Sequence, residues 1–203
     1  MRSIAAAGMA GSDDVLAGPV IMDPNGGMVM DSKHGLRRIF GSNGKSGPVE
    51  FTTEQIGLYR GLMNRIENAV REEFGVERVH HTVPTFLTRI RGSPSWHPAN
   101  MHDEYYHPHV DKANTPHYVY SGLLYLAEHG TDFTGGEFRF IDVDGNRTVL
   151  PFPGRLSLFT SGRENEHMLE KVLTGERLTL SFWFTCDPNL ATDTYLGRRQ
   201  ARG

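Results

Sequence analysis

RLTLSFWFT, residues 177–185, is the stretch that decides the fold. Its even positions, 178 to 184, are all apolar, and they alternate with Arg177, Thr179, Ser181 and Trp183. Successive side chains of a strand point to opposite faces of its sheet. This strand therefore has one apolar face, which can pack beneath a helix. Its other face carries polar groups, which can line the interior of a barrel, and a barrel lined in this way contains a pocket.

A long helix is predicted over residues 52–74. Thr52 and Gln55 form a plausible capping box at its start, and Gly75 is a plausible stop at its end. Between them, apolar residues recur at steps of three and four from Ile56 to Phe74, which makes one apolar stripe. We interpret this stripe as core, so the helix must lie on a flat apolar surface.

The remaining pattern is that of short strands separated by Gly, Asp, Asn and Pro. We expect strands at 76–83, 85–91, 118–126, 136–141, 147–151, 155–160, 168–173 and 177–186. Asp144-Gly145-Asn146 predicts a hairpin, and Thr174-Gly175-Glu176 predicts a further turn. About eight short strands after one long helix indicate a mainly β, cupin-like jelly roll, with the helix packed on its major sheet.

We expect three regions along the chain. Residues 1–50 are rich in Gly and Met with weak periodicity, so they predict an irregular N-terminal extension with short helices. Residues 51–187 would form the folded domain. Residues 188–203 are polar and end in a basic run, which indicates a solvated, fraying tail.

Composition excludes several classes of protein. A formal net charge of -3 gives no electrostatic reason to expect nucleic acid as a partner. One cysteine, Cys186, cannot form an intrachain disulfide, and we interpret it as a buried packing residue. No run approaches the ~18 apolar residues that a membrane span requires, so we expect no membrane contact from this chain itself.

His107-Pro108-His109-Val110-Asp111 is the densest group of potential metal ligands. On a strand, His109 and Asp111 would share a face and could reach one ion. Two histidines and a carboxylate on one face of an octahedron are the ligands of non-haem Fe(II) oxygenases. The third ligand must come from a distant strand, and His167, ten residues before Arg177, is the best candidate.

These residues together resemble a known family. His109 and Asp111, then Gly135-Gly136-Glu137-Phe138, then His167 and Arg177 have the order and spacing of the prolyl-4-hydroxylase-like 2-oxoglutarate oxygenases. Tyr106 precedes His109 by three residues, as is frequent in that family, and Tyr125 and Trp183 also match positions of its oxygen-sensing members. The resemblance covers roughly residues 30–190.

The resemblance implies a double-stranded β-helix fold and an Fe(II)- and 2-oxoglutarate-dependent dioxygenase. His109, Asp111 and His167 would be the catalytic metal ligands. Arg177 would pair with the C5 carboxylate of 2-oxoglutarate, assisted by the Tyr125 hydroxyl and by Ser181. Dioxygen would be the other co-substrate, with ascorbate as a candidate stimulant, and succinate and CO2 would be released. The expected substrate is a polypeptide side chain, with prolyl as one candidate.

Two departures from the family limit what carries over. Collagen-type prolyl 4-hydroxylases usually have lysine where Arg177 stands, so collagen-like substrates are not implied. The segment 91–104 is longer than the matching loop of the oxygen-sensing enzymes, so their substrate contacts are not transferred. We expect this loop and residues 112–116 to form the rim of the site.

Two alternatives remain open at this point. A zinc hydrolase is one, because residues 107–111 also spell HxHxD, although such enzymes continue with a histidine where Lys112 follows and have an α/β scaffold. A catalytically inactive jelly-roll binding module that retains the metal site is the other. Localisation is also open: Asn146-Arg147-Thr148 is a glycosylation acceptor sequence, which suits the lumenal part of a membrane-anchored protein, and a cytoplasmic domain is the other possibility.

Overall fold

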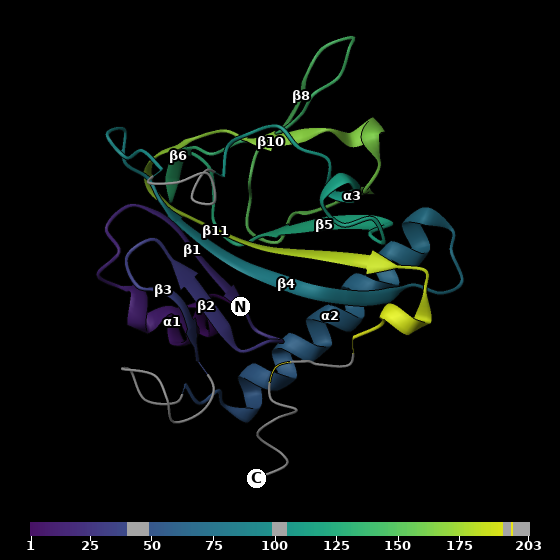
Figure 1. The fold of residues 1–203 in the computed structure, drawn as a ribbon, viewed down its shortest axis with the longest axis horizontal. Coiled ribbons are helices and arrows are strands. Elements are labelled where there is room, and N and C mark those ends of the chain that lie inside the picture. The colour runs from purple at the N-terminus through teal and green to yellow at the C-terminus, as the bar shows by residue number, and fades with distance from the viewer. Residues whose placement is uncertain (40–48, 99–104, 193–195, 197–203) are drawn as a thin grey trace.

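The computed structural model describes residues 1–39, 49–98, 105–192 and 196. Its major sheet has eight strands, seven of which follow one another as neighbours, while β6 (Phe133–Gly135) pairs with β11 alone. Their order is β3 (Gly35–Arg38), β2 (Met28–Asp31), β1 (Gly18–Asp23), β4 (His80–Arg91), β11 (Val172–Thr185), β5 (Tyr120–Tyr125) and β9 (Leu156–Thr160). A smaller sheet has the order β10 (His167–Leu169), β7 (Phe138–Phe140) and β8 (Arg147–Val149). The two sheets lie one above the other, in agreement with the predicted mainly β architecture (Figure 1).

Strand β11 is central because it pairs with β4, β5 and β6. The predicted alternation is confirmed: Leu180, Phe182 and Phe184 are completely buried in the main core. The predicted turn at 174–176 is wrong, since β11 continues through it. Gly175 has a φ of +74°, which a residue with a side chain rarely adopts, and the register with β6 shifts between Val172 and Thr174. The glycine thus permits an irregularity within the strand where we expected a reversal.

Helix α2 (Thr53–Phe74) confirms the predicted helix. Thr52 and Gln55 form a capping box, and Gly75 ends the helix in the left-handed conformation. Four residues of the predicted stripe are almost completely buried: Tyr59, Met63, Ile66 and Val70. The helix lies across the face of the major sheet that is turned away from the smaller sheet (Figure 1). None of the described helices is long and apolar enough to cross a membrane.

The N-terminal region is more regular than we expected. Helix α1 (Arg2–Met9) and a 3-10 turn are present, but strands β1, β2 and β3 follow them and extend the major sheet. β2 and β3 have four residues each, which is too few for a strand period to be visible in the sequence. The tail also differs from the expectation, because Leu196 is buried and the Thr192 amide donates to the His81 carbonyl. Cys186, which we interpreted as a buried packing residue, is exposed at the end of β11. The proposed boundaries of the regions stay a prediction.

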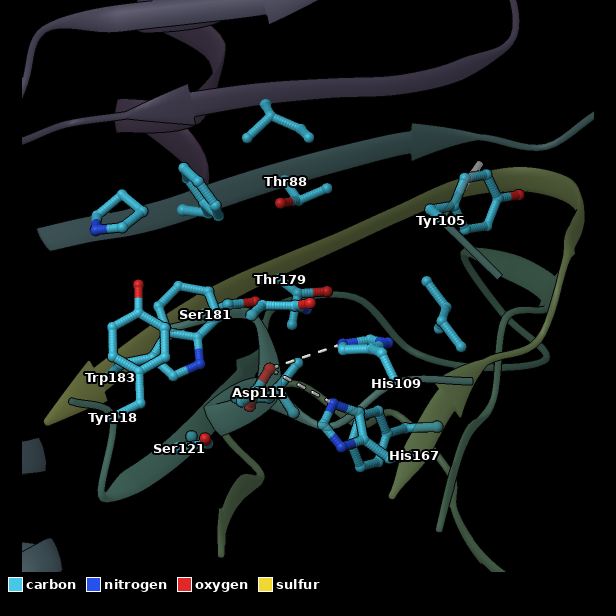
Figure 2. A pocket seen from close by; sticks show the side chains of 18 of the residues that line it. Thr88, Tyr105, His109, Asp111, Tyr118, Ser121, His167, Thr179, Ser181 and Trp183 are labelled. Carbon is cyan, nitrogen blue, oxygen red and sulfur yellow. Dashed lines mark ion pairs between the residues drawn. The ribbon is translucent and has the colours of Figure 1, made fainter. Parts of the chain in front are cut away.

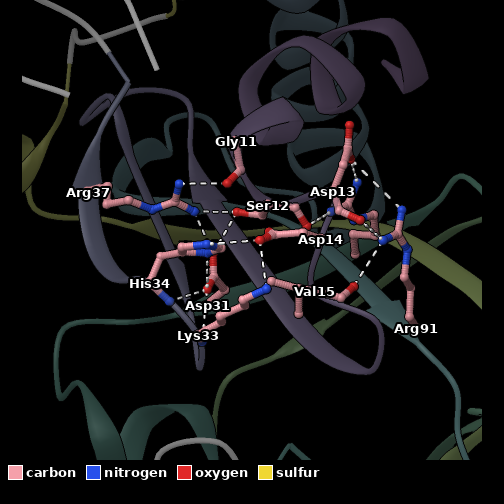
Figure 3. Close-up of polar contacts among 11 residues, drawn as sticks. Gly11, Ser12, Asp13, Asp14, Val15, Asp31, Lys33, His34, Arg37 and Arg91 are labelled. Carbon is pink, nitrogen blue, oxygen red and sulfur yellow. Dashed lines mark hydrogen bonds and ion pairs between the residues drawn. The ribbon is translucent and has the colours of Figure 1, made fainter. Parts of the chain in front are cut away.

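A polar cluster holds the β2–β3 hairpin against the turn that follows α1 (Figure 3). Asp31, whose side chain is fully buried, is its centre. Its carboxylate accepts hydrogen bonds from the Ser12 hydroxyl at 2.6 Å, from the backbone amide of His34 at 2.7 Å and from the Arg37 guanidinium. A buried carboxylate is tolerated because these donors replace the water that it loses.

Replacing Asp31 with Asn should lower the free energy of unfolding by about 2–3 kcal/mol, because the buried donors around it lose a charged acceptor. Chemical denaturation measures this difference. The matched control is Asp14→Asn in the same cluster, whose side chain is 53% exposed. An exposed ion pair contributes little to stability, so the control should be nearly neutral. Equal effects of the two substitutions would contradict the central role of Asp31.

Candidate metal and co-substrate site

His109 and His167 are brought together by their backbones. They form an isolated antiparallel bridge in which the His109 amide donates to the His167 carbonyl at 2.8 Å and the His167 amide donates back at 3.0 Å. Asp111 follows as the first residue of the short helix α3 (Asp111–Asn114). The expectation that His109 and Asp111 lie on one regular strand is therefore wrong. The chain turns into a helix between them, and the turn directs both side chains to the same point.

Three potential ligand atoms, one from each of His109, Asp111 and His167, lie within 4.8 Å of one another. Oδ1 of Asp111 is 3.6 Å from Nε2 of His109 and 3.9 Å from Nε2 of His167 (Figure 2). Separations of this size leave room for one ion between the three side chains. Two imidazole nitrogens and one carboxylate oxygen, with further positions open, are the ligand set that suits Fe(II).

The other ring nitrogen of each histidine faces a backbone carbonyl. Nδ1 of His167 is 2.8 Å from the Asn165 carbonyl, and Nδ1 of His109 is 3.2 Å from the His107 carbonyl. A carbonyl only accepts, so the ring proton belongs on Nδ1 and Nε2 keeps its lone pair for a metal. Burial lowers the pKa of His167, and the nearby Asp111 carboxylate opposes this shift. The lowered pKa favours the neutral imidazole, which is the form that binds metal.

Arg177 lies at another part of the same cavity and is 3% exposed. Its Nε donates to the Gly136 carbonyl at 3.0 Å and its Nη1 donates to the Thr179 hydroxyl at 2.6 Å. Its Nη2 is buried and has no hydrogen-bond partner among the residues that the structure describes. Burial lowers the pKa of Arg177 to about 10, so the group still carries its charge at neutral pH.

The two glycines before Glu137 explain how this arginine is oriented. Gly135 and Gly136 have φ values of +67° and +68°, in the region that favours glycine. A Cβ on Gly136 would lie 2.8 Å from Val172 and 3.1 Å from Cδ of Arg177. The missing side chain lets the Gly136 carbonyl approach Nε of the arginine closely.

The cavity that contains these groups has a volume of about 490 Å³. Its wall is largely apolar, with Phe86, Phe138, Phe159 and Trp183 among its residues. Of the expected co-substrate residues, Ser181 lines the cavity, as Arg177 does. Tyr125 is fully buried beside them, with its ring centre 5.7 Å from the Arg177 guanidinium carbon, and burial raises its pKa.

Some cavity residues were not anticipated from the sequence. Ile21 comes from β1, in the region that we expected to be irregular, and Tyr105 stacks on Trp96 with ring centres 5.6 Å apart. Thr88 could have been found from the alternation of β4. Of the two expected rim loops, Asn114 and Thr115 line the cavity, whereas residues 99–104 lie outside the described residues. Tyr106 is half-buried and is not among the lining residues.

Comparisons with known proteins show what the chain is similar to. Residues 96–185 match the family described as the 2OG-Fe(II) oxygenase superfamily. The protein named 2-oxoglutarate and iron-dependent oxygenase domain-containing protein 3 of Xenopus tropicalis is 40% identical over 94% of this chain, and that of Homo sapiens is 38% identical over 93%. The chain spans 59% and 58% of the length of these two relatives.

Solved structures show the same fold. A 2OG-Fe(II) oxygenase family oxidoreductase from Burkholderia pseudomallei has a TM-score of 0.56 at 16% identity, over 91% of this chain and 81% of its own. A Pseudomonas putida prolyl-4-hydroxylase has a TM-score of 0.51 at 17% identity, over 91% and 83%. The predicted double-stranded β-helix is confirmed. The α/β scaffold of the alternative zinc hydrolase is not found in the described part of the chain.

We predict one Fe(II) per chain at His109, Asp111 and His167, replaceable by Mn(II) without turnover. His167→Ala should remove stoichiometric metal binding, because two ligands remain, while thermal unfolding stays cooperative. Metal analysis after anaerobic loading and dialysis measures this. His107→Ala is the matched control: this exposed histidine has its ring centre 5.6 Å from that of His109 and is outside the ligand group. Full iron binding by His167→Ala would remove His167 from the ligand set.

Proposed function

We propose that this chain is an Fe(II)- and 2-oxoglutarate-dependent dioxygenase that hydroxylates a polypeptide side chain. Two similarities support the proposal: residues 96–185 match the 2OG-Fe(II) oxygenase superfamily, and the chain is 40% identical, over 94% of its length, to 2-oxoglutarate and iron-dependent oxygenase domain-containing protein 3 of Xenopus tropicalis. The activity of the whole protein is part of this proposal, because the chain spans about 59% of the relative from Xenopus tropicalis.

One observation carries the proposal. Three side chains that could hold a metal ion and a buried arginine with an unsatisfied Nη2 line the same cavity. A metal anchor and a carboxylate anchor in one cavity suit a small molecule that chelates metal at one end and has a carboxylate at the other. 2-Oxoglutarate has this chemistry, with its keto acid at one end and its C5 carboxylate at the other.

Each residue has a defined part in the proposed site. His109, Asp111 and His167 would hold Fe(II). Arg177 would receive the C5 carboxylate at its guanidinium, and the bound anion would satisfy Nη2. Tyr125 and Ser181 would assist from beside the arginine and from the cavity wall.

When bound, iron and 2-oxoglutarate supply the oxidising chemistry, in which dioxygen, 2-oxoglutarate and a substrate C–H bond give succinate, CO2 and a C–OH bond. The chain itself would bind and orient the iron, the co-substrate and the substrate, and would exclude water from them. Phe138 and Phe159 lie against His167, with ring centres 5.0 and 5.1 Å from its own. This aromatic packing orients the imidazole plane and would keep bulk water from that side of a bound metal. Ascorbate would support turnover by keeping the iron reduced.

A polypeptide is the substrate class that the relatives support. Residues of this chain are 42% identical, over 34% of its length, to prolyl 3-hydroxylase 2 of Gallus gallus. A prolyl side chain suits the largely apolar cavity wall, although the identity of the substrate residue is the finer part of the proposal. Asn146 is exposed and lies between β7 and β8, so its glycosylation is sterically feasible, as residence in the lumenal part of a membrane-anchored protein would require. The cytoplasmic alternative predicts an unmodified Asn146.

Turnover separates the enzyme from the alternative, an inactive binding module that retains the metal. The iron-loaded protein should form succinate from 2-oxoglutarate in the presence of ascorbate and dioxygen, and more quickly with a substrate peptide. Mass spectrometry of the acid products measures this. Tight binding of Fe(II) and 2-oxoglutarate without any succinate, for a pool of peptides as well as for the protein alone, would favour the binding module.

Replacing Arg177 with Met should weaken 2-oxoglutarate binding at least about tenfold. Removing one partner of a buried charge pair costs ~2–5 kcal/mol, and each 1.4 kcal/mol is a factor of ten in affinity. Titration of the Fe(II)-loaded protein under nitrogen, followed through the visible metal-to-ligand absorption band, measures the dissociation constant.

Arg177→Lys is the matched control for this substitution. It keeps the positive charge but loses the two-pronged geometry, so its effect should be smaller than that of Met. Iron binding should be nearly unchanged in both variants, because the arginine is not one of the three metal-ligating residues. If Arg177→Met binds 2-oxoglutarate as tightly as the parent protein does, another basic residue holds the carboxylate.

A further inference from the structure

A row of directly paired residues crosses the major sheet from the cavity to its edge. Thr179 of β11 pairs with Thr88 of β4, Thr88 with Ile21 of β1, Ile21 with Met30 of β2, and Met30 with Leu36 of β3. Residues directly opposite one another on antiparallel strands project from the same face of the sheet. The first three line the cavity. Met30 and Leu36 therefore continue the cavity face beyond the cavity itself.

This outer part of the row is apolar and exposed. Met30 is 37% exposed and Leu36 is 66% exposed, whereas Val29 on the opposite face of β2 is buried. A sheet with one face on the core and one in water normally alternates between apolar and polar residues. In strand β2, with the sequence MVMD, Met28 and Met30 project from one face and Val29 projects from the other. Apolar residues on both faces are the pattern of a strand that is covered on both sides.

The hairpin that carries the row is held rigidly from its other face. Asp31 and Arg37 project from β2 and β3 toward the turn that follows α1, where they contact Ser12 (Figure 3). His34, in the tight turn between the strands, contacts the same carboxylate. This network keeps Met30 and Leu36 at a constant position relative to the cavity.

We propose that Ile21, Met30 and Leu36 form a docking surface for the polypeptide substrate, which receives an apolar side chain of the substrate at some distance from the residue that reacts. The inference rests on the proposed function, because it assumes a polypeptide in the cavity. Continuity identifies the occupant: the surface begins inside the cavity at Ile21 and leaves it along one row of the sheet. Methionine also suits this task, because its flexible thioether adapts to different apolar partners.

The spacing of the strands predicts where the substrate residue should lie. Neighbouring strands are about 4.8 Å apart, so Leu36 is roughly 10 Å from Ile21 and roughly 14 Å from Thr88 along the row. An extended peptide advances about 3.3–3.6 Å per residue. The preferred apolar residue should therefore lie about three to four residues from the hydroxylated one, on one side only.

The test uses a pool of synthetic peptides of random sequence with the iron-loaded protein, 2-oxoglutarate and ascorbate. Mass spectrometry identifies the hydroxylated peptides and the modified residue, whatever its type. We expect enrichment of Leu, Ile, Met or Phe at one such distance. In Leu36→Glu, and in Met30→Glu, peptides with that residue should lose about tenfold in relative rate, because a buried contact of one large apolar side chain is lost.

Leu58→Glu is the matched control. Leu58 is 51% exposed and belongs to α2, on the opposite face of the major sheet, so its replacement should leave the peptide selection unchanged. The melting temperature and the affinity for 2-oxoglutarate should be the same in all three variants, since the replaced side chains are exposed and lie outside the co-substrate residues.

The remaining outcomes overturn the inference in distinguishable ways. The docking surface would be excluded if the hydroxylated peptides showed no apolar preference, or if Leu36→Glu and Met30→Glu both retained that preference. The proposed enzymatic function would stand in either case. Succinate formation without any hydroxylated peptide would exclude a peptide occupant. A parent protein that is dimeric and becomes monomeric in Leu36→Glu, with peptide selection unchanged, would assign this face to a second copy of the chain. Absence of succinate under every condition would instead reject the proposed function.

Discussion

The antiparallel pairing of β11 with β4 is the constraint on which the rest of the structure depends. It sets Arg177 opposite Ile90 and Thr179 opposite Thr88, and so decides which side chains share each face. A shift by one residue would send the arginine into the core beneath α2 and the phenylalanines into the cavity. The apolar stripe of α2 and the apolar positions of β11 thus stabilise the register, and the register in turn determines the composition of the cavity.

The position of Arg177 is unfavourable for the stability of the folded protein. Its charge is removed from water, its Nε and Nη1 find neutral oxygens, and its Nη2 finds no partner in the described part of the chain. Burial without a counter-charge disfavours the charged form, which is why its pKa is lowered to about 10. An anion that enters the cavity reverses this cost. The folded protein therefore retains electrostatic energy that a carboxylate can release on binding, which is a physical reason for affinity and for selection of an acid.

The sequence predicted the long helix, the alternation of residues 177–185 and the joint pattern of ligands, because each depends on a period or spacing that repeats often enough to be recognised. It did not predict β1, β2 and β3, since β1 has apolar residues on both faces and β2 and β3, with four residues each, are too short for a strand period to be visible. We expected His109, Asp111 and His167 to lie close together, but we attributed this to a shared strand face. The backbone bridge between the two histidines and the start of α3 at Asp111 bring them together instead. Local patterns identified the participants, whereas only the tertiary pairing explains the geometry.

The unexpected strands also connect stability with recognition. By pairing with β4, β1 adds Ile21 to the cavity wall, and β2 and β3 then extend the same face outward. The hairpin would be marginal by itself, because two short strands bury little apolar surface. The buried hydrogen bonds of Asp31 on one face stabilise the hairpin. The residues on its other face are therefore not needed to hold the hairpin in place. Apolar side chains at Met30 and Leu36 are then a cost in solubility without a benefit to folding. A benefit in binding, as in the proposed docking surface, is the physical reason for such residues beside the cavity.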